Sequence, residues 1–380
     1  MDPIVIVGTG LAGYNTAREL RKLDGEAPLV IVSADGAGFY SKPMLSNALA
    51  SGKTAQQLLN KAAAAMREEL RATLIERTSV AELDPAAHRI RAGGQNIVYS
   101  KLVLALGADP IRLPLAGNGA AAVLSVNDLD DYARFRAAVE GGRRVAVLGA
   151  GLIGCEFAND LAIVGYSVDV ADIAAQPLGR LLPPEAAAGV RDALAALGVR
   201  WHLGKKAAAV ERRGALLVLR FEDGSQVETD IVLSAVGLAP RTALARAAGL
   251  AVNRGIVVDR FLRSSDPDIY ALGDCAEVEG QVLPFVMPIM HASRALASTL
   301  AGNDRALAYP PMPVVVKTPA LPTVVCPPLP GSIGSWQVEL ERGGAVARYV
   351  DGAGKLLGFA LTGPACARKS QMLKEMPPAS

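Results

Sequence analysis

The chain has 380 residues, of which 51% are hydrophobic, and this is enough for two or three domains with cores of their own. Its 39 basic and 37 acidic residues leave a net charge of +2, which excludes a global basic surface for nucleic acid. Aromatic residues make up only 4%, which argues against a platform of exposed rings for single-stranded nucleic acid. We therefore expect no nucleic-acid partner.

The cysteines lie far apart, at positions 155, 275, 326 and 366, and form no Cys-x-x-Cys pair. We expect neither a metal site nor a local redox disulfide, and scattered cysteines in a large chain favour a cytoplasmic location. The apolar run at residues 4–7 ends in glycine and predicts a strand, not a signal peptide. The longest uncharged stretch is rich in proline, so we expect no membrane-spanning helix.

The first motif begins with residues 3–7, a continuous apolar run that is typical of a strand buried on both faces. A glycine-rich turn follows, and residues 14–23 then place apolar side chains on one helical face. In this order the glycines allow a tight turn, a close approach of backbone to a pyrophosphate, and helix–strand contact. The helix N-terminus adds N–H donors and a positive dipole end. The predicted dinucleotide turn consists of Gly8, Thr9, Gly10, Leu11, Ala12 and Gly13.

An acidic residue that binds a ribose is expected at the end of the second strand, residues 29–32. Here the acid is displaced, because the strand is followed by Ser33, Ala34 and Asp35. Either Asp35 or, more weakly, Ser33 is therefore expected to contact the ribose.

The same pattern returns in the middle of the chain, with a strand at 143–148, a turn, a helix at 155–164 and a strand at 166–171. Asp172 closes that last strand, where an acid hydrogen-bonds a ribose 2′-OH and repels a 2′-phosphate. The motif therefore predicts a site for NADH in preference to NADPH. Two dinucleotide sites in one chain suggest a redox relay in which one cofactor stays bound and the other exchanges. The glycines of this second turn are Gly149, Gly151 and Gly154.

Two further strands end in glycine, at Gly107 and Gly237, and they bracket the second motif. We interpret them as the places where the chain leaves and re-enters the first domain. Residues 310–330 hold eight prolines and are expected to be extended. The predicted fold class is α/β, with two Rossmann-like dinucleotide-binding domains and a small C-terminal α/β domain. The expected boundaries are 1–107 with 236–310, 108–235, and 311–380.

A short strand that ends in Gly273 and Asp274 completes a set of three motifs. Together they resemble the pyridine nucleotide–disulfide oxidoreductase family over residues 1 to about 310. The resemblance implies that the first turn binds FAD, that the second binds NADH, and that Asp274 holds the ribityl chain and pyrophosphate of FAD. Disulfide reductases of this family carry a redox cysteine in the segment that follows the first motif. Residues 38–46 contain no cysteine, which excludes a thiol relay there.

The segment from Tyr40 to Ser46, with Lys42-Pro43 at its centre, is similar to that of rubredoxin and flavorubredoxin reductases. Residues 153–161 and the Lys317-Thr318-Pro319 segment also resemble rubredoxin reductases. The resemblance implies that NADH gives a hydride to FAD, which passes electrons one at a time to rubredoxin, a small acidic protein that docks transiently. A ferredoxin reductase of an oxygenase system and a flavoprotein redox sensor are the alternatives.

Three charged residues, Lys42, Glu156 and Lys317, are candidates for catalytic roles that also contact the cofactors. The resemblance places Lys42 and Glu156 beside the flavin and nicotinamide as a pair, and Lys317 at the pyrimidine side of the flavin. Their alternatives are a solvated lysine, a glutamate favoured by a helix N-terminus, and a lysine on a strand edge. Val80 is expected to contact the adenine through its backbone, or else to be a core residue. The turn glycines Gly107 and Gly237 complete the predicted cofactor contacts, and the short C-terminal unit favours a monomer.

Overall fold

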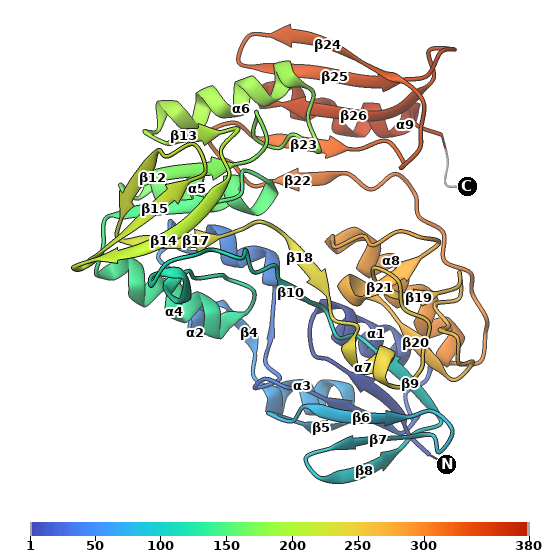
Figure 1. Ribbon diagram of the computed structural model, residues 1–380. Helices are drawn as coiled ribbons and strands as arrows, with labels where there is room; N and C mark the ends of the chain where they lie inside the picture. The colour runs from blue at the N-terminus through green and yellow to red at the C-terminus, as the bar shows by residue number, and fades with distance from the viewer. Residues whose placement is uncertain (1, 378–380) are drawn as a thin grey trace.

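The computed structural model describes residues 2–377, so the ends of the predicted domains, at residue 1 and residues 378–380, lie outside the described residues. Three sheets organise this part of the chain, and we name them the N-terminal, inserted and C-terminal sheets. Figure 1 shows the N-terminal sheet at the bottom, the inserted sheet on the left and the C-terminal sheet at the top. The predicted α/β fold class is confirmed.

The N-terminal sheet has five parallel strands, and one of them comes from the later part of the chain. Its apolar strands are buried on both faces, which is why they read as continuous runs of valine, isoleucine and leucine. In spatial order the strands are β20 (Ile269–Ala271), β9 (Lys101–Leu104), β1 (Ile4–Val7), β2 (Leu29–Val32) and β5 (Thr73–Ile75).

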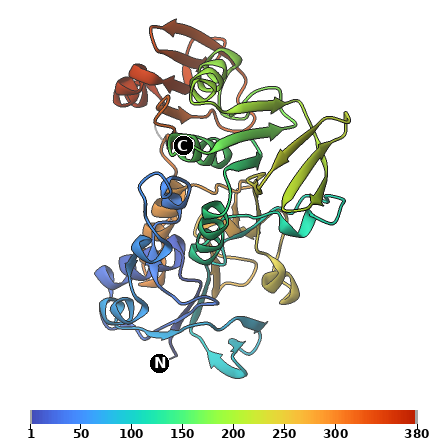
Figure 2. The same cartoon turned by 90° about the vertical axis from the view of Figure 1, so that its left-hand side faces the viewer.

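Several helices, two strand pairs and one three-stranded sheet complete the N-terminal unit. The first helix, α1, packs against α8, and Figure 2 shows this unit below the other two. The helices and 3₁₀ turns are α1 (Leu11–Leu23), η1 (Lys42–Asn47), α2 (Ala55–Leu58), α3 (Ala63–Leu70), α7 (Ala243–Ala247), η3 (Gly273–Cys275) and α8 (Val286–Leu300). The strands are β3 (Phe39–Tyr40) with β4 (Leu59–Lys61), β6 (Val80–Asp84) with β7 (Arg89–Ala92) and β8 (Gln95–Val98), and β19 (Ile256–Val258) with β21 (Ala276–Val278).

The inserted sheet repeats the parallel arrangement with four strands, and an antiparallel three-stranded sheet packs beside it. Two short antiparallel strands, β10 (Ala108–Pro110) and β18 (Leu238–Pro240), carry the chain between the units side by side (Figure 1). The parallel strands are β13 (Arg200–Leu203), β12 (Ser167–Asp172), β11 (Arg144–Leu148) and β17 (Ile231–Ser234). The remaining elements are η2 (Ala120–Ala122), α4 (Leu129–Glu140), α5 (Leu152–Ile163), α6 (Pro184–Ala196), β14 (Ala207–Arg213), β15 (Leu216–Phe221) and β16 (Gln226–Thr229).

The C-terminal sheet is antiparallel and has five strands, with a 3₁₀ turn and a short helix at its end. The proline-rich residues 310–330 contain no helix and supply the strands β22 and β23 of this sheet, in line with the extended segment predicted there. The spatial order is β22 (Val314–Val316), β23 (Thr323–Cys326), β26 (Leu356–Thr362), β25 (Gly344–Val350) and β24 (Ser335–Glu341). The last two elements are η4 (Gly363–Arg368) and α9 (Lys369–Glu375).

One hydrophobic core joins the three units. It contains Leu45 and Ala48 from the N-terminal unit, Leu161 from α5, and Val316 and Ala360 from the C-terminal sheet. Burial of this shared apolar surface holds the three units against one another.

Three helices begin earlier than the sequence pattern predicts. The glycines at positions 10 and 151 are N-caps, so α1 and α5 start directly after them. Helix α8, which the sequence predicts at residues 289–300, starts at Val286 and includes Pro288. The first-turn N–H groups have no partner within the helix, so a proline can replace one of them. Among the described residues no helix is long and apolar enough to cross a membrane.

Candidate active site

A large cavity is lined by residues of all three units and has a volume of about 2480 Å³. Sites for one small ligand usually measure ~300–1,000 Å³, so this cavity has room for two dinucleotides. The predicted site residues that line it are Gly10, Leu11, Ala12, Lys42, Gly107, Gly149, Gly151, Glu156, Asp172, Gly237, Asp274 and Lys317. Those that do not line it are Gly8, Thr9, Gly13, Ser33, Ala34, Asp35, Val80 and Gly154.

The glycines of the first turn have two different roles: two allow close backbone packing, and one faces the cavity. Gly8 has a φ of +117°, and a Cβ there would lie 2.2 Å from the carbonyl oxygen of Ala105. A Cβ on Gly13 would lie 1.9 Å from the carbonyl oxygen of Gly8. A Cβ on Gly10 would meet no atom within 4 Å, and this residue caps the N-terminus of α1. The turn thus leaves open space at a helix N-terminus, which fits a pyrophosphate.

The second turn has the same geometry. Gly149 has a φ of +102°, and a Cβ on Gly154 would lie 1.8 Å from its carbonyl oxygen. Gly151 caps α5, and a Cβ on this residue would meet no atom within 4 Å. The second turn therefore also fits an anionic group of a dinucleotide.

The acids that follow β2 and β12 differ in position. The carboxylate of Asp172 lines the cavity and accepts N–H groups of Ala150 at 2.6 Å and Ala174 at 2.7 Å. Asp35 instead accepts the hydroxyl of Ser33 at 2.6 Å, beside the first turn and outside the cavity lining. The hydroxyls of Ser33 and Thr9 lie 2.5 Å apart in the same cluster. Contact of Ser33, Ala34 or Asp35 with a ribose therefore stays a prediction.

Lys42 pairs with Asp274, with 3.9 Å between its Nζ and the nearer carboxylate oxygen. Burial raises the pKa of Asp274, and the charge of Lys42 opposes that increase. Burial also lowers the pKa of Lys42, while Asp274 raises it. The two groups face the same cavity and each supports the charged form of the other.

The expected pairing of Lys42 with Glu156 is wrong, because Glu156 pairs with Lys317. The Nζ of Lys317 lies 2.5 Å from Oε2 of Glu156, whose side chain is completely buried. The hydroxyl of Ser46 donates to the same oxygen at 2.5 Å, and the backbone N–H of Lys317 donates to Oε1 at 2.8 Å. The segment after β22 brings Lys317 onto α5, a long-range contact that local sequence pattern does not encode.

The remaining predicted residues lie at the edges of the site. Gly107 and Gly237 adopt positive φ values of +72° and +115° and line the cavity where the chain passes between units. Val80 is half-buried and packs against the N-terminal core. Its contact with an adenine stays a prediction.

Two polar residues of the site were not singled out from the sequence. Ser46 lies in the segment that resembles rubredoxin reductases, so the sequence pointed to this residue, but no role was predicted for it. Asn127 had no signal: its Nδ2 donates to the carbonyl oxygen of Ala108 at 3.0 Å, and it lines the cavity. Within residues 2–377 its buried Oδ1 has no hydrogen-bond partner, which fits a ligand that donates there.

One cysteine lies at the cavity. Of the four cysteines, Cys326 lines the cavity, and burial raises its pKa to about 11. It is therefore a thiol and not a thiolate near neutral pH. In the described part of the chain no group of three or more His, Cys, Asp or Glu side chains could hold a metal ion.

Two dinucleotide turns that share one cavity define a class of redox protein. Residues 2–298 match the family profile described as pyridine nucleotide-disulphide oxidoreductase, and the chain belongs to that family. Residues 306–376 match a second profile, described as a rubredoxin binding C-terminal domain.

Within the family, the chain is similar over its full length to rubredoxin-NAD(+) reductases and, at 37–38% identity, to nitric oxide reductase FlRd-NAD(+) reductases. The chain is 50% identical over 378 residues to the one from Alcanivorax borkumensis, which covers 99% of both chains. It is 43% identical over 387 residues to the one from Acinetobacter baylyi, covering 100% of this chain and 98% of that protein. Among solved structures, a ferredoxin reductase from Rhodopseudomonas palustris has a TM-score of 0.90 at 26% identity and covers 100% of this chain and 96% of its own.

Proposed function

We propose that the chain is an NADH-dependent rubredoxin reductase that holds FAD. The observation that carries this proposal is the cavity, which both glycine turns line and which reaches the segment that matches the rubredoxin-binding profile. The unit of residues 1–107 and 236–310 binds FAD, that of 108–235 binds NADH, and that of 311–380 completes the docking side. A monomer in the cytoplasm is the expected form.

The turn of the N-terminal unit fits FAD, and that of the inserted unit fits NADH. Gly10 and the N-terminus of α1 would hold the FAD pyrophosphate, and Asp274, which lines the cavity, would bind the ribityl chain. Gly151 and Asp172 would hold the pyrophosphate and the adenosine ribose of NADH. When bound, FAD can accept a hydride from NADH and release single electrons to rubredoxin.

The charged side chains of the cavity orient the cofactors and adjust local charge. Lys42 and Lys317 line the cavity, and their ammonium groups would stabilise the negative charge of a reduced flavin bound there. Asp274 and Glu156 hold these two ammonium groups in position. Glu156 does so from α5, which also carries the NADH turn, so the NADH unit and the flavin side are linked directly.

The docking side for rubredoxin is the part of the cavity mouth that the C-terminal unit forms. Lys355 and Lys369 line it, and within residues 2–377 neither ammonium has a carboxylate within 4.0 Å. Leu329 and Met287 line the same mouth, and their exposed fractions are 64% and 43%. Basic groups around exposed apolar side chains fit a small acidic partner that binds briefly.

The solved ferredoxin reductase of similar fold makes ferredoxin reduction the second candidate. The test is single-turnover kinetics: the FAD-loaded protein is reduced with one equivalent of NADH and mixed with rubredoxin or with a [2Fe–2S] ferredoxin. We expect reoxidation by rubredoxin to be about tenfold faster or more, and to slow as salt is added, because the encounter is electrostatic. Equal or faster reoxidation by ferredoxin contradicts the proposal. A long-lived complex with NADH and negligible reoxidation by either protein favours a redox sensor.

A further inference from the structure

One face of α5 carries three buried polar side chains that bond to other units. They lie at positions 156, 159 and 160, a spacing that puts them on one side of a helix. Glu156, Asn159 and Asp160 have exposed fractions of 0%, 1% and 3%. Glu156 forms the pair with Lys317, and Asn159 Oδ1 accepts the backbone N–H of Ala320 at 3.1 Å. Asp160 remains, and it bonds to the N-terminal unit.

The carboxylate of Asp160 binds two backbone N–H groups at the end of the segment that carries Ser46. Its Oδ2 accepts from Leu49 at 2.9 Å and from Ala50 at 3.2 Å. These residues follow directly on η1, the 3₁₀ turn that contains Ser46. Burying a carboxylate costs free energy unless hydrogen bonds satisfy its oxygens, so an acidic side chain at this buried position calls for an explanation.

Apolar contacts already attach this segment to α5. Leu45 and Ala48 are buried in the same core as Leu161. Such contacts are non-directional, so they attach the segment without setting the direction of its backbone N–H groups. Hydrogen bonds to two consecutive N–H groups are directional, so Asp160 fixes the register between the segment and the helix.

We propose that Asp160 is a positioning residue: by holding the amides of Leu49 and Ala50 it sets the place of the Ser46 hydroxyl, and through it the Glu156–Lys317 pair at the cavity. This inference rests on the proposed function, because it assumes that the pair faces the flavin. Ser46 donates to Glu156 and accepts from Lys317 Nζ at 3.2 Å, so a shift of the segment moves both contacts.

The groups around Asp160 are few. Glu156 lies one helical turn earlier, Lys317 approaches from the C-terminal unit, and Tyr132 of α4 is close enough for the Asp160 charge to raise its pKa. Burial raises the pKa of Asp160 to about 6, while the two amides and Lys317 oppose the increase. The carboxylate form, which accepts from both amides, is therefore the dominant form above neutral pH.

The test uses Asp160→Asn in the full-length, FAD-loaded protein, because asparagine keeps the shape but replaces one acceptor oxygen with a donor. Hydrogen exchange followed by mass spectrometry is expected to show about tenfold lower protection of the amides of Leu49 and Ala50. Single-turnover flavin reduction by NADH is expected to slow about threefold to tenfold with unchanged NADH affinity. Unchanged protection of these amides, or a reduction rate within about twofold of the parent, overturns the proposal.

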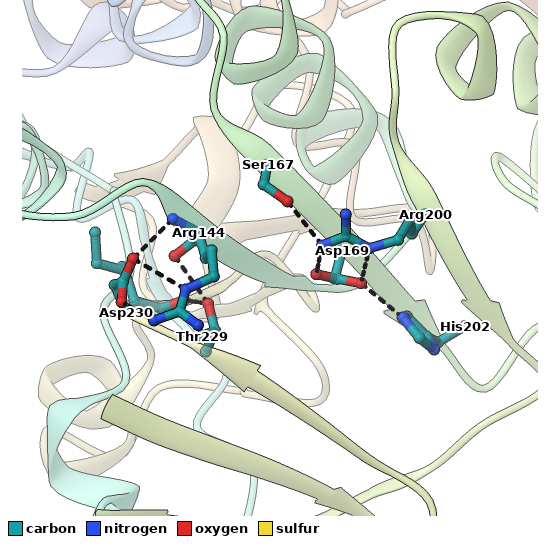
Figure 3. Close-up of polar contacts among 8 residues, drawn as sticks. Arg144, Ser167, Asp169, Arg200, His202, Thr229 and Asp230 are labelled. Atoms are coloured by element: carbon teal, nitrogen blue, oxygen red, sulfur yellow. Dashed lines mark hydrogen bonds and ion pairs between the residues drawn. The ribbon is translucent and has the colours of Figure 1, made fainter. Parts of the chain in front are cut away.

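The matched control is Asp169→Asn, in the same unit. Figure 3 shows Asp169 on β12 with Arg200 and His202 on β13. Its carboxylate oxygens lie 2.6 Å from Arg200 Nη2 and 2.8 Å from His202 Nε2, and its side chain is 5% exposed. Asp169 and Arg200 lie in the first halves of their strands, and none of the three residues lines the cavity. We expect this variant to lose stability but to keep the flavin reduction rate and the exchange of residues 49 and 50.

A second variant keeps the proposal testable if Asp160→Asn does not fold. Ser46→Ala removes the hydroxyl that Asp160 is inferred to position, and it should slow flavin reduction while leaving the exchange of Leu49 and Ala50 as in the parent. A rate equal to that of the parent contradicts the inference. If the proposed function is wrong, NADH does not reduce the flavin bound to the parent protein. The hydrogen-exchange measurement then still decides whether Asp160 holds the segment.

Discussion

Replacing Lys317 with methionine removes the counter-ion of Glu156 and keeps a long apolar side chain. The Glu156 side chain is 0% exposed, whereas that of Lys317 is 30% exposed. Removing one partner of a buried ion pair costs about 3–5 kcal/mol. Two donors to Glu156 survive, the Ser46 hydroxyl and the backbone N–H of residue 317, and water screens part of the pair. We therefore expect the free energy of unfolding to fall by about 2–3 kcal/mol.

Urea unfolding followed by tryptophan fluorescence measures this loss, because Trp201 lies in the inserted sheet and Trp336 in the C-terminal sheet. A double-mutant cycle with Glu156→Gln isolates the pair. The double variant should be less destabilised than the sum of the single variants by about 2 kcal/mol, since it leaves no buried charge without a partner. Costs that simply add would refute the reasoning, because they would mean that the two charges do not interact.

Three further predictions concern the second turn and the pH dependence. Gly154→Ala should abolish NADH binding and destabilise the inserted unit, because the added Cβ meets the carbonyl oxygen of Gly149 at 1.8 Å. Gly151→Ala should fold normally and weaken NADH binding alone, because a Cβ there meets no atom within 4 Å. Thermal unfolding measures the loss of stability and NADH titration the loss of binding, so the two assays distinguish the variants. Asp172→Asn should narrow the preference for NADH over NADPH in kcat/KM about tenfold, and an unchanged ratio would show that Asp172 does not select the cofactor. The folded-state pKa of Asp160, about 6, lies above its ordinary value of 3.8, so ionisation of this group costs the parent stability as the pH rises from about 4 through 6. The difference in the free energy of unfolding between Asp160→Asn and the parent, measured by urea unfolding between pH 4 and 7, should therefore shift in favour of the variant by up to about 2 kcal/mol. A pH-independent difference would contradict that assignment.

Local patterns predicted most of the fold. The glycine turns and the strands before them follow from apolar runs and from the positions of Gly8 and Gly149, because close backbone contact leaves no room for a Cβ there. Gly107 and Gly237 were interpreted as crossing points because they bracket the second motif, and the short paired strands β10 and β18 begin directly after them. The exact domain boundaries stay a prediction. Helix starts were less accurate, because the glycine N-caps and a first-turn proline carry no apolar periodicity.

Part of the cavity lining was predictable from the sequence, but the contacts among its residues were not. Lys42, Glu156 and Lys317 all line the cavity, yet the partner of Glu156 depends on where the chain places residue 317 relative to α5. The bond between Asp160 and Leu49 likewise joins positions 111 residues apart. Such pairings are fixed by the packing of three units, and one sequence without its structure contains no local signal for them.

The most direct test of the electron path is an anaerobic titration of ferric rubredoxin by NADH with a catalytic amount of the FAD-loaded protein. NADH delivers two electrons and the iron of rubredoxin accepts one, so we expect about two rubredoxins to be reduced for each NADH consumed. Ferredoxin in place of rubredoxin should be reduced much more slowly. Consumption of NADH without reduction of rubredoxin, or faster reduction of ferredoxin, would contradict the account.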